Sequence, residues 1–348
     1  MSNTIEEIKQ SNGTVLKLCN GIFPELFKDI VGQPQARKRI EHYLRSYLKT
    51  RHIPNSLFTA QKGNGKTTIA RETAKGLVLF NSDGQVEINQ ETSLPRRKKF
   101  IEINCSTLTT VNDFLANWVV PYIQDRDVTV LFDEASEIPH DITMALLTIL
   151  APNVLKTTFA YKDYVCEFDF TRQSFLFATS EPQKVFHALL DRLKRIDLEE
   201  YSLSEIAAII QKGSPNVVYD DNVLEAIASV SRGNARNAQD YAAEIKTYLG
   251  QEDGKFTMKD WIELKSILSI QPLGLTATEI RILEHLNDAP DGTSLTCLAA
   301  KMGLSRESLQ RDGELYLQKH SLISIEAGIG RVITASGQNY LKKIKTKK

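Results

Sequence analysis

The chain has 348 residues, enough for two or three domains. Hydrophobic residues make up 42% and charged residues 25%, as in ordinary soluble globular proteins. Lysine plus arginine and aspartate plus glutamate each total 43, so overall charge cannot draw the protein to nucleic acid. Any DNA contact must therefore depend on local groups. The sequence contains no apolar run of about 18 residues, so we expect no membrane partner.

Cysteine and histidine usage predicts neither disulfides nor a cysteine or histidine metal site. The four cysteines are widely separated and the six histidines are scattered along the chain. Residues 1–10 lack the basic-then-apolar pattern of a secretion signal. We therefore expect a cytoplasmic protein with reduced thiols, beginning with a flexible arm over residues 1–20.

Residues 21–199 alternate between short apolar runs and helical patterns. IPNSLFTA, FIEINCS, VTVLFDE and SFLFATS are the strand-like runs. Buried, continuously apolar strands separated by helices predict a parallel α/β sheet. Between the first helix and FIEINCS, residues 81–99 are polar and end in RRKK. We interpret this segment as a surface insertion rather than a DNA-contacting loop.

The rest of the chain predicts a helical domain followed by a small mixed domain. Strand patterns vanish over residues 200–270, where amphipathic helical patterns such as LSEIAAIIQK take over. QPLG is a turn-like linker. Residues 271–341 then read as three helices and two short strands around a glycine turn, the pattern of a winged helix-turn-helix. The basic tail, residues 342–348, is expected to be disordered.

The stretch FTAQKGNGKTTIA follows a predicted strand and opens a predicted helix, the context that a phosphate-binding loop requires. In that geometry the backbone amides and the helix N-terminus hold a polyphosphate, Lys66 reaches the β- and γ-phosphates, and the Thr67 hydroxyl binds Mg²⁺. Ala60 stands at the first position, where glycine is usual, and is tolerated if its backbone stays outside the left-handed region. The predicted nucleotide-binding residues of the loop are Gly63, Asn64, Gly65, Lys66, Thr67 and Thr68.

A second acidic motif supports the same chemistry. VTVLFDE places Asp133 and Glu134 at the end of an apolar strand. Asp133 suits coordination of the Mg²⁺ held by Thr67, and Glu134 suits activation of an attacking water. A strand that merely ends in acidic residues is the simpler alternative, which the upstream phosphate loop disfavours. The predicted cofactors are ATP and Mg²⁺.

Three further residues are weak candidates by themselves. Thr179 ends SFLFATS, Arg192 lies in ALLDRLKR, and Arg236 lies in SRGNAR. Hydrolysis of ATP needs a polar group near the attacking water and positive charge at the γ-phosphate. Without further context, arginines in such positions are usually solvated.

The sequence resembles the AAA+ ATPases, and within them the motors of Holliday-junction branch migration. The likeness covers residues 23–341 and includes DIVGQPQARKRIEHYL, VLFDEASEIP, FATSEPQKVFHALLDRLKR and SRGNARNAQDYA. It continues into GLTATEIRILEHL and GRVITASGQNYL, the winged helix that most AAA+ relatives lack. The resemblance implies an α/β fold: a parallel-sheet P-loop ATPase domain, an all-α lid domain and a C-terminal winged helix.

The resemblance also implies roles for five residues of this sequence. Ile30 and Val31 would line the adenine pocket, and Thr179 would position the attacking water. Arg192 would be an arginine finger that reaches ATP bound to a neighbouring subunit, and Arg236 would couple the lid to the γ-phosphate. Because the finger acts across an interface, the resemblance implies a homo-oligomeric ring, hexameric when active.

DNA contacts are expected in the winged helix. Arg331 matches a position where the family contacts the DNA backbone, and Arg306 and Arg311 lie on the predicted third helix. Acidic residues nearby dilute this charge, so we expect backbone contacts without base reading. Winged helices also serve as protein-interaction modules, and that alternative stays open.

The departures from the family pattern are local. Ala60 replaces a glycine, Leu190 stands where an additional arginine is usual, and DEASEIP lacks the usual histidine. The insertion at 81–99 is not expected. Residues 154–170 match the position of a hairpin that binds a RuvA-like junction-recognising adaptor, but their sequence leaves that partner in doubt.

We therefore expect an ATP-hydrolysing motor that translocates double-stranded DNA and drives branch migration at four-way junctions during recombination and repair. One alternative is an AAA+ loader or remodeller that assembles another protein on DNA, although a winged helix is unusual in that class. A second is a non-hydrolysing, ATP-gated assembly module. A sequence-specific transcription regulator is disfavoured by the weakly basic third helix.

Overall fold

The computed structural model describes residues 26–151, 156–161, 164–250 and 254–345, so the expected N-terminal arm lies outside the described residues. The chain packs as two compact units. The first comprises Met1–Glu205 with Asn234–Arg236, and the second comprises Ile206–Gly233 with Asn237–Lys348. The regions expected to form the lid and the winged helix thus share one unit.

A five-stranded parallel sheet with strand order β2-β3-β6-β1-β7 forms the centre of the first unit. Its strands are β1 (Ser56–Thr59), β2 (Lys99–Asn104), β3 (Val128–Asp133), β6 (Ser174–Thr179) and β7 (Lys194–Asp197). β1 and β6 are buried along their whole length, and so is all but the last residue of β3, as their apolar sequences predict. The predicted α/β fold is confirmed.

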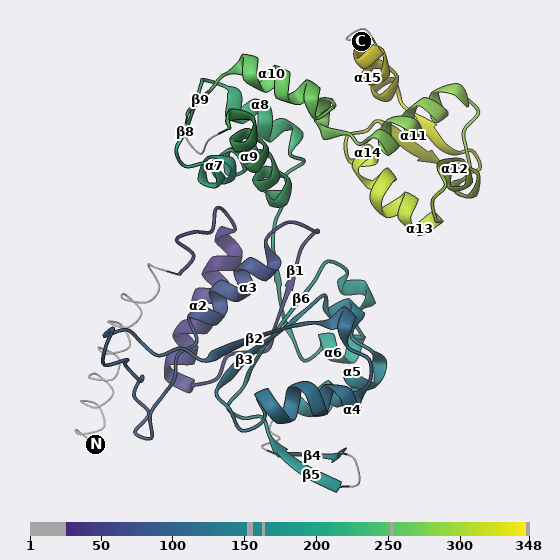
Figure 1. Cartoon of the computed structure of the whole chain (residues 1–348). Helices are drawn as coiled ribbons and strands as arrows, with labels where there is room; N and C mark the ends of the chain where they lie inside the picture. Colours follow the sequence, from purple (N-terminus) through teal and green to yellow (C-terminus); the bar gives the residue numbers. More distant parts are fainter. Residues whose placement is uncertain (1–25, 152–155, 162–163, 251–253, 346–348) are drawn as a thin grey trace, which may run out of the picture. The chain divides into compact units, whose positions relative to one another are not determined.

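Helices cover both faces of this sheet (Figure 1). One face carries α2 (Pro34–Thr50) and α3 (Lys66–Lys75), and the other carries α4 (Val111–Phe114), η2 (Leu115–Ile123), α5 (His140–Ile149) and α6 (His187–Leu190). Successive side chains of a strand point to opposite faces, so Leu131 packs with α2 and α3 while Phe132 packs on the other side. The two cores together fix the position of the sheet's carboxyl edge.

The predicted surface insertion, residues 81–99, is an ordered antiparallel ladder. Isolated bridges pair Val78 with Arg97 and Phe80 with Val86. Phe80 and Val86 pack against the core beside α2, and the Arg51 guanidinium lies 5.6 Å from the centre of the Phe80 ring. Two apolar side chains thus anchor a segment whose sequence is mostly polar.

A β-hairpin projects from the first unit (Figure 1). It consists of β4 (Lys156–Tyr161) and β5 (Tyr164–Asp169), paired antiparallel. Phe168 is buried and Phe159 is partly buried against the core, whereas the Val165 side chain is exposed. The expected hairpin at 154–170 includes residues 154, 155, 162 and 163, which lie outside the described residues.

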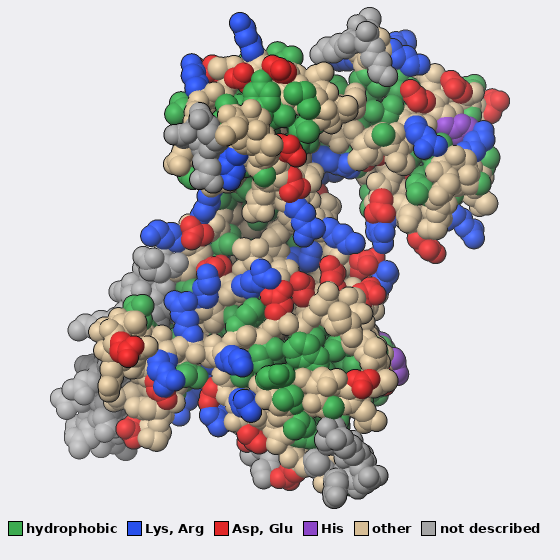
Figure 2. Space-filling view, in the orientation of Figure 1, with side chains coloured by type: hydrophobic (Ala, Val, Ile, Leu, Met, Phe, Trp, Pro, Cys, Tyr) green, Lys and Arg blue, Asp and Glu red, His purple; other side chains and the backbone are tan. Residues whose placement is uncertain are grey.

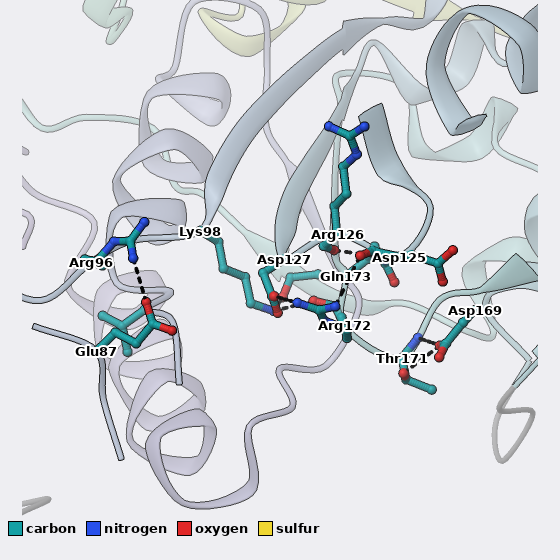
Figure 3. Close-up of polar contacts among 12 residues, drawn as sticks. Glu87, Arg96, Lys98, Asp125, Arg126, Asp127, Asp169, Thr171, Arg172 and Gln173 are labelled. Atoms are coloured by element: carbon teal, nitrogen blue, oxygen red, sulfur yellow. Dashed lines mark hydrogen bonds and ion pairs between the residues drawn. The ribbon is translucent and has the colours of Figure 1, made fainter. Parts of the chain in front are cut away.

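Polar side chains meet where β2, β3 and β6 begin, at the edge opposite their carboxyl ends (Figure 3). The buried Lys98 ammonium group donates to the Arg172 carbonyl oxygen at 2.7 Å and to the Ser174 hydroxyl at 3.2 Å. Arg172 pairs with Asp127. Burial lowers the pKa of Lys98 from 10.5 to about 8, with Asp127 opposing this shift and Arg172 adding to it.

This depressed pKa predicts a pH dependence of stability. Between pH 8 and 10 the unfolded chain binds more protons at Lys98 than the folded chain, so stability should rise with pH. From pH 7 to 9.5, the unfolding free energy should increase by about 2 kcal/mol relative to Lys98→Met. We would follow urea unfolding by Trp118 fluorescence in a Trp261→Phe background, so that only the first unit reports. The exposed Lys99 provides the matched control: Lys99→Met should show the wild-type pH dependence, and equal curves for wild type and Lys98→Met would contradict the prediction.

The second unit begins with the helical region expected to be the lid, residues 206–270, which we call the lid subdomain. Its helices are α7 (Leu203–Gly213), α8 (Val223–Val230), α9 (Ala235–Leu249) and α10 (Met258–Ile267), of which α7 and α9 begin with residues of the first unit. The expectation that this region is all-α is wrong in one detail: β8 (Val217–Tyr219) pairs in parallel with β9 (Gly254–Phe256). Both strands are three residues long, too short for a recognisable pattern, and their buried Val217 and Phe256 side chains hold the pair against the helices.

The C-terminal subdomain, residues 275–345, follows the turn η5 (Pro272–Gly274). Its elements are α11 (Ala277–Asp288), α12 (Leu295–Met302), α13 (Arg306–Ser308), η6 (Leu309–Glu314), α14 (Leu315–Lys319), β10 (Ile323–Glu326), β11 (Gly330–Ile333) and α15 (Ala335–Lys345). Three helical segments before an antiparallel hairpin is the order expected for a winged helix. Residues 342–345, expected in a disordered tail, belong to α15.

Candidate nucleotide-binding site

The glycine-rich loop connects β1 to α3, as its sequence predicts. Gly63 and Gly65 have φ values of 83° and 81°, which an L side chain rarely adopts. Ala60 lies partly buried against the core and does not have a positive φ, so its methyl group costs no backbone strain. No side chain caps the N-terminus of α3, which leaves its first amides to a bound anion. The loop thus has the backbone geometry that phosphate binding requires.

Lys66 lies at the start of α3 with its ammonium group turned into the loop. The group donates to the carbonyl oxygens of Ala60 and Gln61, each at 3.1 Å. Burial lowers the Lys66 pKa, while Glu134 and Asp133 raise it. Because an anionic phosphate would raise this lowered pKa, phosphate binding favours the charged ammonium group.

The acidic end of β3 lies beside the loop. The Thr67 hydroxyl donates to Asp133 Oδ2 at 3.0 Å, and the other oxygen of Asp133 accepts from the Glu134 amide at 3.0 Å. A hydroxyl and one carboxylate are typical Mg²⁺ partners when nucleotide oxygens complete the shell. No larger group of histidine, cysteine and acidic ligands occurs among the described residues. The residues present therefore fit Mg²⁺ bound together with a nucleotide.

Glu134 adopts a left-handed conformation with φ 54°, directly after the strand. Such backbone strain in a residue other than glycine is concentrated at functional sites. The nearby Cys105 thiol is affected by the Glu134 carboxylate. Burial raises the pKa of Cys105 most, and the negative charges of Asp133, Glu134 and Glu137 raise it further. The strand end therefore places a second carboxylate next to the Asp133–Thr67 pair.

Thr179 ends β6, between β3 and β1. In the sheet register Asp133 lies opposite Ala178, and Thr59 lies opposite Thr179, so three strand ends meet at one edge. The Thr179 side chain is fully buried, donates to the Ser136 hydroxyl at 3.1 Å and accepts from the Glu181 amide at 3.0 Å. The fold thus brings the predicted Thr179 to the acidic strand end.

Residues at the start of α9 contact the phosphate loop within the first unit. The Arg236 amide donates to the Gly63 carbonyl oxygen at 3.1 Å. Asn234 donates from its side chain to the Lys62 carbonyl oxygen at 2.6 Å, and its own oxygen accepts from the Arg236 amide at 2.9 Å. A side chain added at Gly63 would collide with Asn234. Sequence reasoning identified Arg236 but missed Asn234, whose position beside Gly233 was the available signal.

The predicted adenine-pocket residues Ile30 and Val31 are half-buried, close to the first of the described residues. Gln33, two residues later, donates to the Glu199 carbonyl oxygen at 2.8 Å and accepts from the Glu199 amide at 2.9 Å. Tyr201 lies next to Gly65 of the phosphate loop. The two Gln33–Glu199 hydrogen bonds hold the segment that contains Ile30 and Val31 to the stretch of chain that leads into α7.

Arg192 follows α6. Among the described residues, no hydrogen bond joins Arg192 to Lys66, Thr67 or Asp133. Its Nη1 donates to the Ala188 carbonyl oxygen at 2.9 Å, and its buried Nε atom has no hydrogen-bond partner in the described part of the chain. An unsatisfied donor on a half-buried arginine is costly unless another group completes it. This placement suits an arginine that acts outside its own nucleotide site.

The three predicted DNA-binding arginines differ in exposure. Arg306 and Arg311 are exposed, and Arg311 forms an ion pair with Asp312 at 2.9 Å. Arg331 instead is largely buried and binds Glu314 through two hydrogen bonds of 2.8 and 3.1 Å. Its guanidinium stabilises the C-terminal subdomain, and we therefore leave Arg331 out of the proposed DNA surface. Figure 2 shows basic and acidic side chains interspersed on the visible face, without a single-sign surface.

Comparisons with known proteins find relatives in DNA metabolism. The chain is 22% identical to the Holliday junction branch migration complex subunit RuvB of Rickettsia africae over 98% of this chain and 95% of that protein. It is 29% identical to DNA polymerase III subunit tau/gamma of Haemophilus influenzae, over 62% of this chain and 30% of that protein. The Escherichia coli tau subunit is 26% identical over 62% of this chain and 32% of its own length. No protein-family model matches.

Solved structures share the fold. Thermotoga maritima RuvB, a Holliday junction branch migration motor, aligns with a TM-score of 0.70 at 19% identity, covering 92% of this chain and 98% of that one. A variant of the same protein aligns with a TM-score of 0.72 over the same shares. No helix in the described ranges is long and apolar enough to cross a membrane.

Proposed function

We propose that this chain, a divergent RuvB-like AAA+ ATPase, is an ATP-driven ring motor that moves double-stranded DNA and drives branch migration at Holliday junctions. The contact that carries the proposal is the 3.0 Å hydrogen bond between Thr67 and Asp133. It joins the phosphate loop to the acidic strand end in a chain similar to RuvB along its whole length.

In this proposal the loop amides, the α3 N-terminus and Lys66 bind the phosphates of ATP. Mg²⁺, held by Thr67 and Asp133, would neutralise charge on the β- and γ-phosphates. Glu134 accepts a proton from the attacking water, which Thr179 helps to position. Arg192 of the adjacent subunit stabilises the charge of the transition state in a hexameric ring.

The second unit would convert turnover into movement. Asn234 and Arg236 contact the loop that surrounds the phosphates, so loss of the γ-phosphate would change the constraint on the start of α9. The C-terminal subdomain, as a winged helix, would contact DNA phosphates through Arg306 and Arg311. The β4–β5 hairpin would bind a RuvA-like junction-binding adaptor, with the exposed Val165 as an apolar contact.

Steady-state ATP turnover tests this proposal. We would measure it without DNA, with linear duplex and with a four-way junction, using Lys66→Ala as the blank. Stimulation of at least about fivefold by junction DNA, accompanied by strand exchange on a labelled junction, is the expected result. ATP binding without turnover under any condition would exclude the motor and favour an ATP-gated assembly module.

A loader or remodeller that assembles another protein on DNA is the second candidate. It is favoured by the likeness to the DNA polymerase III tau subunits, which is higher in identity than the RuvB match but covers less of the chain. In the same assay, an ATP turnover rate that junction DNA does not change would favour this candidate. Similarity to RuvB through the C-terminal subdomain supports the motor over the loader.

A further inference from the structure

The segment from the end of α8 to the start of α9 is divided between the two units. Asn234 and Arg236 belong to the first unit, where they contact the phosphate loop, whereas Arg232 belongs to the second. Arg232 and Gly233 both have left-handed backbones, with φ values of 61° and 65°. A non-glycine residue keeps this conformation only where its surroundings hold it. The contacts of the Arg232 side chain identify what holds it.

Arg232 binds the C-terminal subdomain through two of its nitrogen atoms. Nη2 donates to Glu279 Oε1 at 2.8 Å, and Nη1 donates to Glu279 Oε2 at 3.1 Å. The Glu279 side chain has no exposed surface, and that of Arg232 is 22% exposed. The guanidinium also lies 3.6 Å from the centre of the Tyr316 ring, a cation–π contact. One lid residue thus contacts both α11 and α14.

Glu279 is built into the start of α11. Its Oε2 atom accepts from the Thr276 amide at 2.8 Å and from the Thr276 hydroxyl at 3.0 Å, which closes the helix-capping box. A buried carboxylate that loses its cationic partner is strongly destabilising, so opening the Arg232–Glu279 pair is costly. The start of α11 is therefore held in one arrangement relative to Arg232.

The linker between the two subdomains is fixed by further contacts. The Tyr316 hydroxyl donates to the Leu273 carbonyl oxygen at 2.8 Å, and the Tyr340 hydroxyl donates to that of Pro272 at 2.8 Å. Gly274 has a φ of 67°, and any side chain there would collide with the Val230 carbonyl group at the end of α8. A linker that was free to bend would not need two partly buried tyrosine hydrogen bonds and a glycine packed against the end of α8.

We propose that Arg232 is a positioning residue that locks the lid and the C-terminal subdomain into one body and passes the nucleotide state, sensed by Asn234 and Arg236, to the DNA-contacting subdomain. The lock itself needs only the contacts above, and the transmission rests on the proposed function. A displacement of residues 234–236 then moves the C-terminal subdomain, because only Gly233 separates Asn234 from Arg232.

The lock is tested by a distance measurement that needs no activity. Spin labels would be placed on the exposed Cys297 and on Glu244→Cys of α9, with Cys19 and Cys166 replaced by serine. A single narrow distance distribution is expected for the parent chain and a clearly broader one for Arg232→Gln. Arg281→Gln, which removes an exposed arginine from the same α11 helix, should leave the distribution narrow.

A narrow distribution in Arg232→Gln would overturn the lock. Should that variant fail to fold, Tyr316→Leu removes the stacked ring and the bond to Leu273 without leaving a charge buried, and it too should broaden the distribution. In the Arg232→Gln/Glu279→Gln double variant, two neutral amides can pair, so the distribution should narrow again. If the distance distribution of the double variant stays broad, the broadening comes from lost packing of the Arg232 side chain and not from its lost pairing with Glu279. That result would contradict the proposal.

The transmission is tested by ATP turnover. In Arg232→Gln, turnover without DNA and the KM for ATP should stay within about threefold of the parent, while stimulation by junction DNA falls at least about tenfold. The Arg281→Gln control should keep full stimulation, and the double variant should recover part of it. A broadened distribution with undiminished stimulation would overturn the transmission. A parent chain with a narrow distribution but no turnover would refute the motor and leave the lock standing.

Discussion

In the Glu134→Gln variant, ATP turnover is expected to fall by about 10³-fold while ATP remains bound. Glutamine has the size of glutamate but cannot accept the proton of the attacking water. The Thr67–Asp133 contact and the Lys66 side chain are untouched by the change, so the binding groups stay in place. Single-turnover hydrolysis and nucleotide binding, measured separately, would distinguish lost chemistry from lost affinity.

Glu137 provides a matched control, because it lies three residues after Glu134 and its negative charge also raises the pKa of Cys105. Its amide donates to the Glu134 carbonyl oxygen at 2.8 Å, so both residues share one short turn. Glu137→Gln should keep turnover within about threefold of the parent. Parent-like turnover in Glu134→Gln, or an equal loss in Glu137→Gln, would remove Glu134 from the role of general base.

Arg192→Ala is expected to lower turnover by about 10³-fold or more, since an arginine finger supplies charge that no other group replaces. The expectation depends on the Nε atom of Arg192, which has no hydrogen-bond partner among the described residues, and on the hydrogen bond from Nη1 to the Ala188 carbonyl oxygen. Arg195→Ala is the control, because Arg195 is exposed and forms a surface ion pair with Asp197. That control should change turnover little.

Mixing two inactive variants tests whether Arg192 acts between subunits. A subunit with Arg192→Ala keeps an intact Lys66, and a subunit with Lys66→Ala keeps an intact Arg192. In a random equal mixture, about a quarter of the interfaces (½ × ½) combine the two intact residues and should regain turnover. No recovery at any ratio, with mixed rings confirmed by native mass spectrometry, would exclude action across the interface.

Local patterns carried most of the information about the nucleotide site. A strand, a glycine-rich turn and a helix are contiguous in sequence, so FTAQKGNGKTTIA predicts its own geometry. The buried strands β3 and β6 are recognisable from their apolar residues, and parallel strands share a carboxyl edge. That shared edge explains why Asp133 and Thr179, 46 residues apart (179 − 133), could be expected at one site.

The partners of individual side chains could not be predicted in this way. Arg331 reads as a wing arginine, but the buried Glu314 accepts hydrogen bonds from two of its three guanidinium nitrogens, Nε and Nη2. Arg232 reads as part of a motif that precedes Arg236, and only the structure reveals Glu279 opposite it. A sequence pattern records the type of each residue but not which distant residue packs against it.

By itself, the sequence determined that the chain has a parallel α/β domain with a phosphate loop, an acidic strand end and a helical region behind it, because these depend on contiguous residues. Only the tertiary structure decided that Ala60 avoids the left-handed region, that Asn234 closes on the loop and that Arg232 joins the lid to the C-terminal subdomain. Those outcomes depend on contacts between residues far apart in the chain, where packing and burial select one partner among many that the sequence allows.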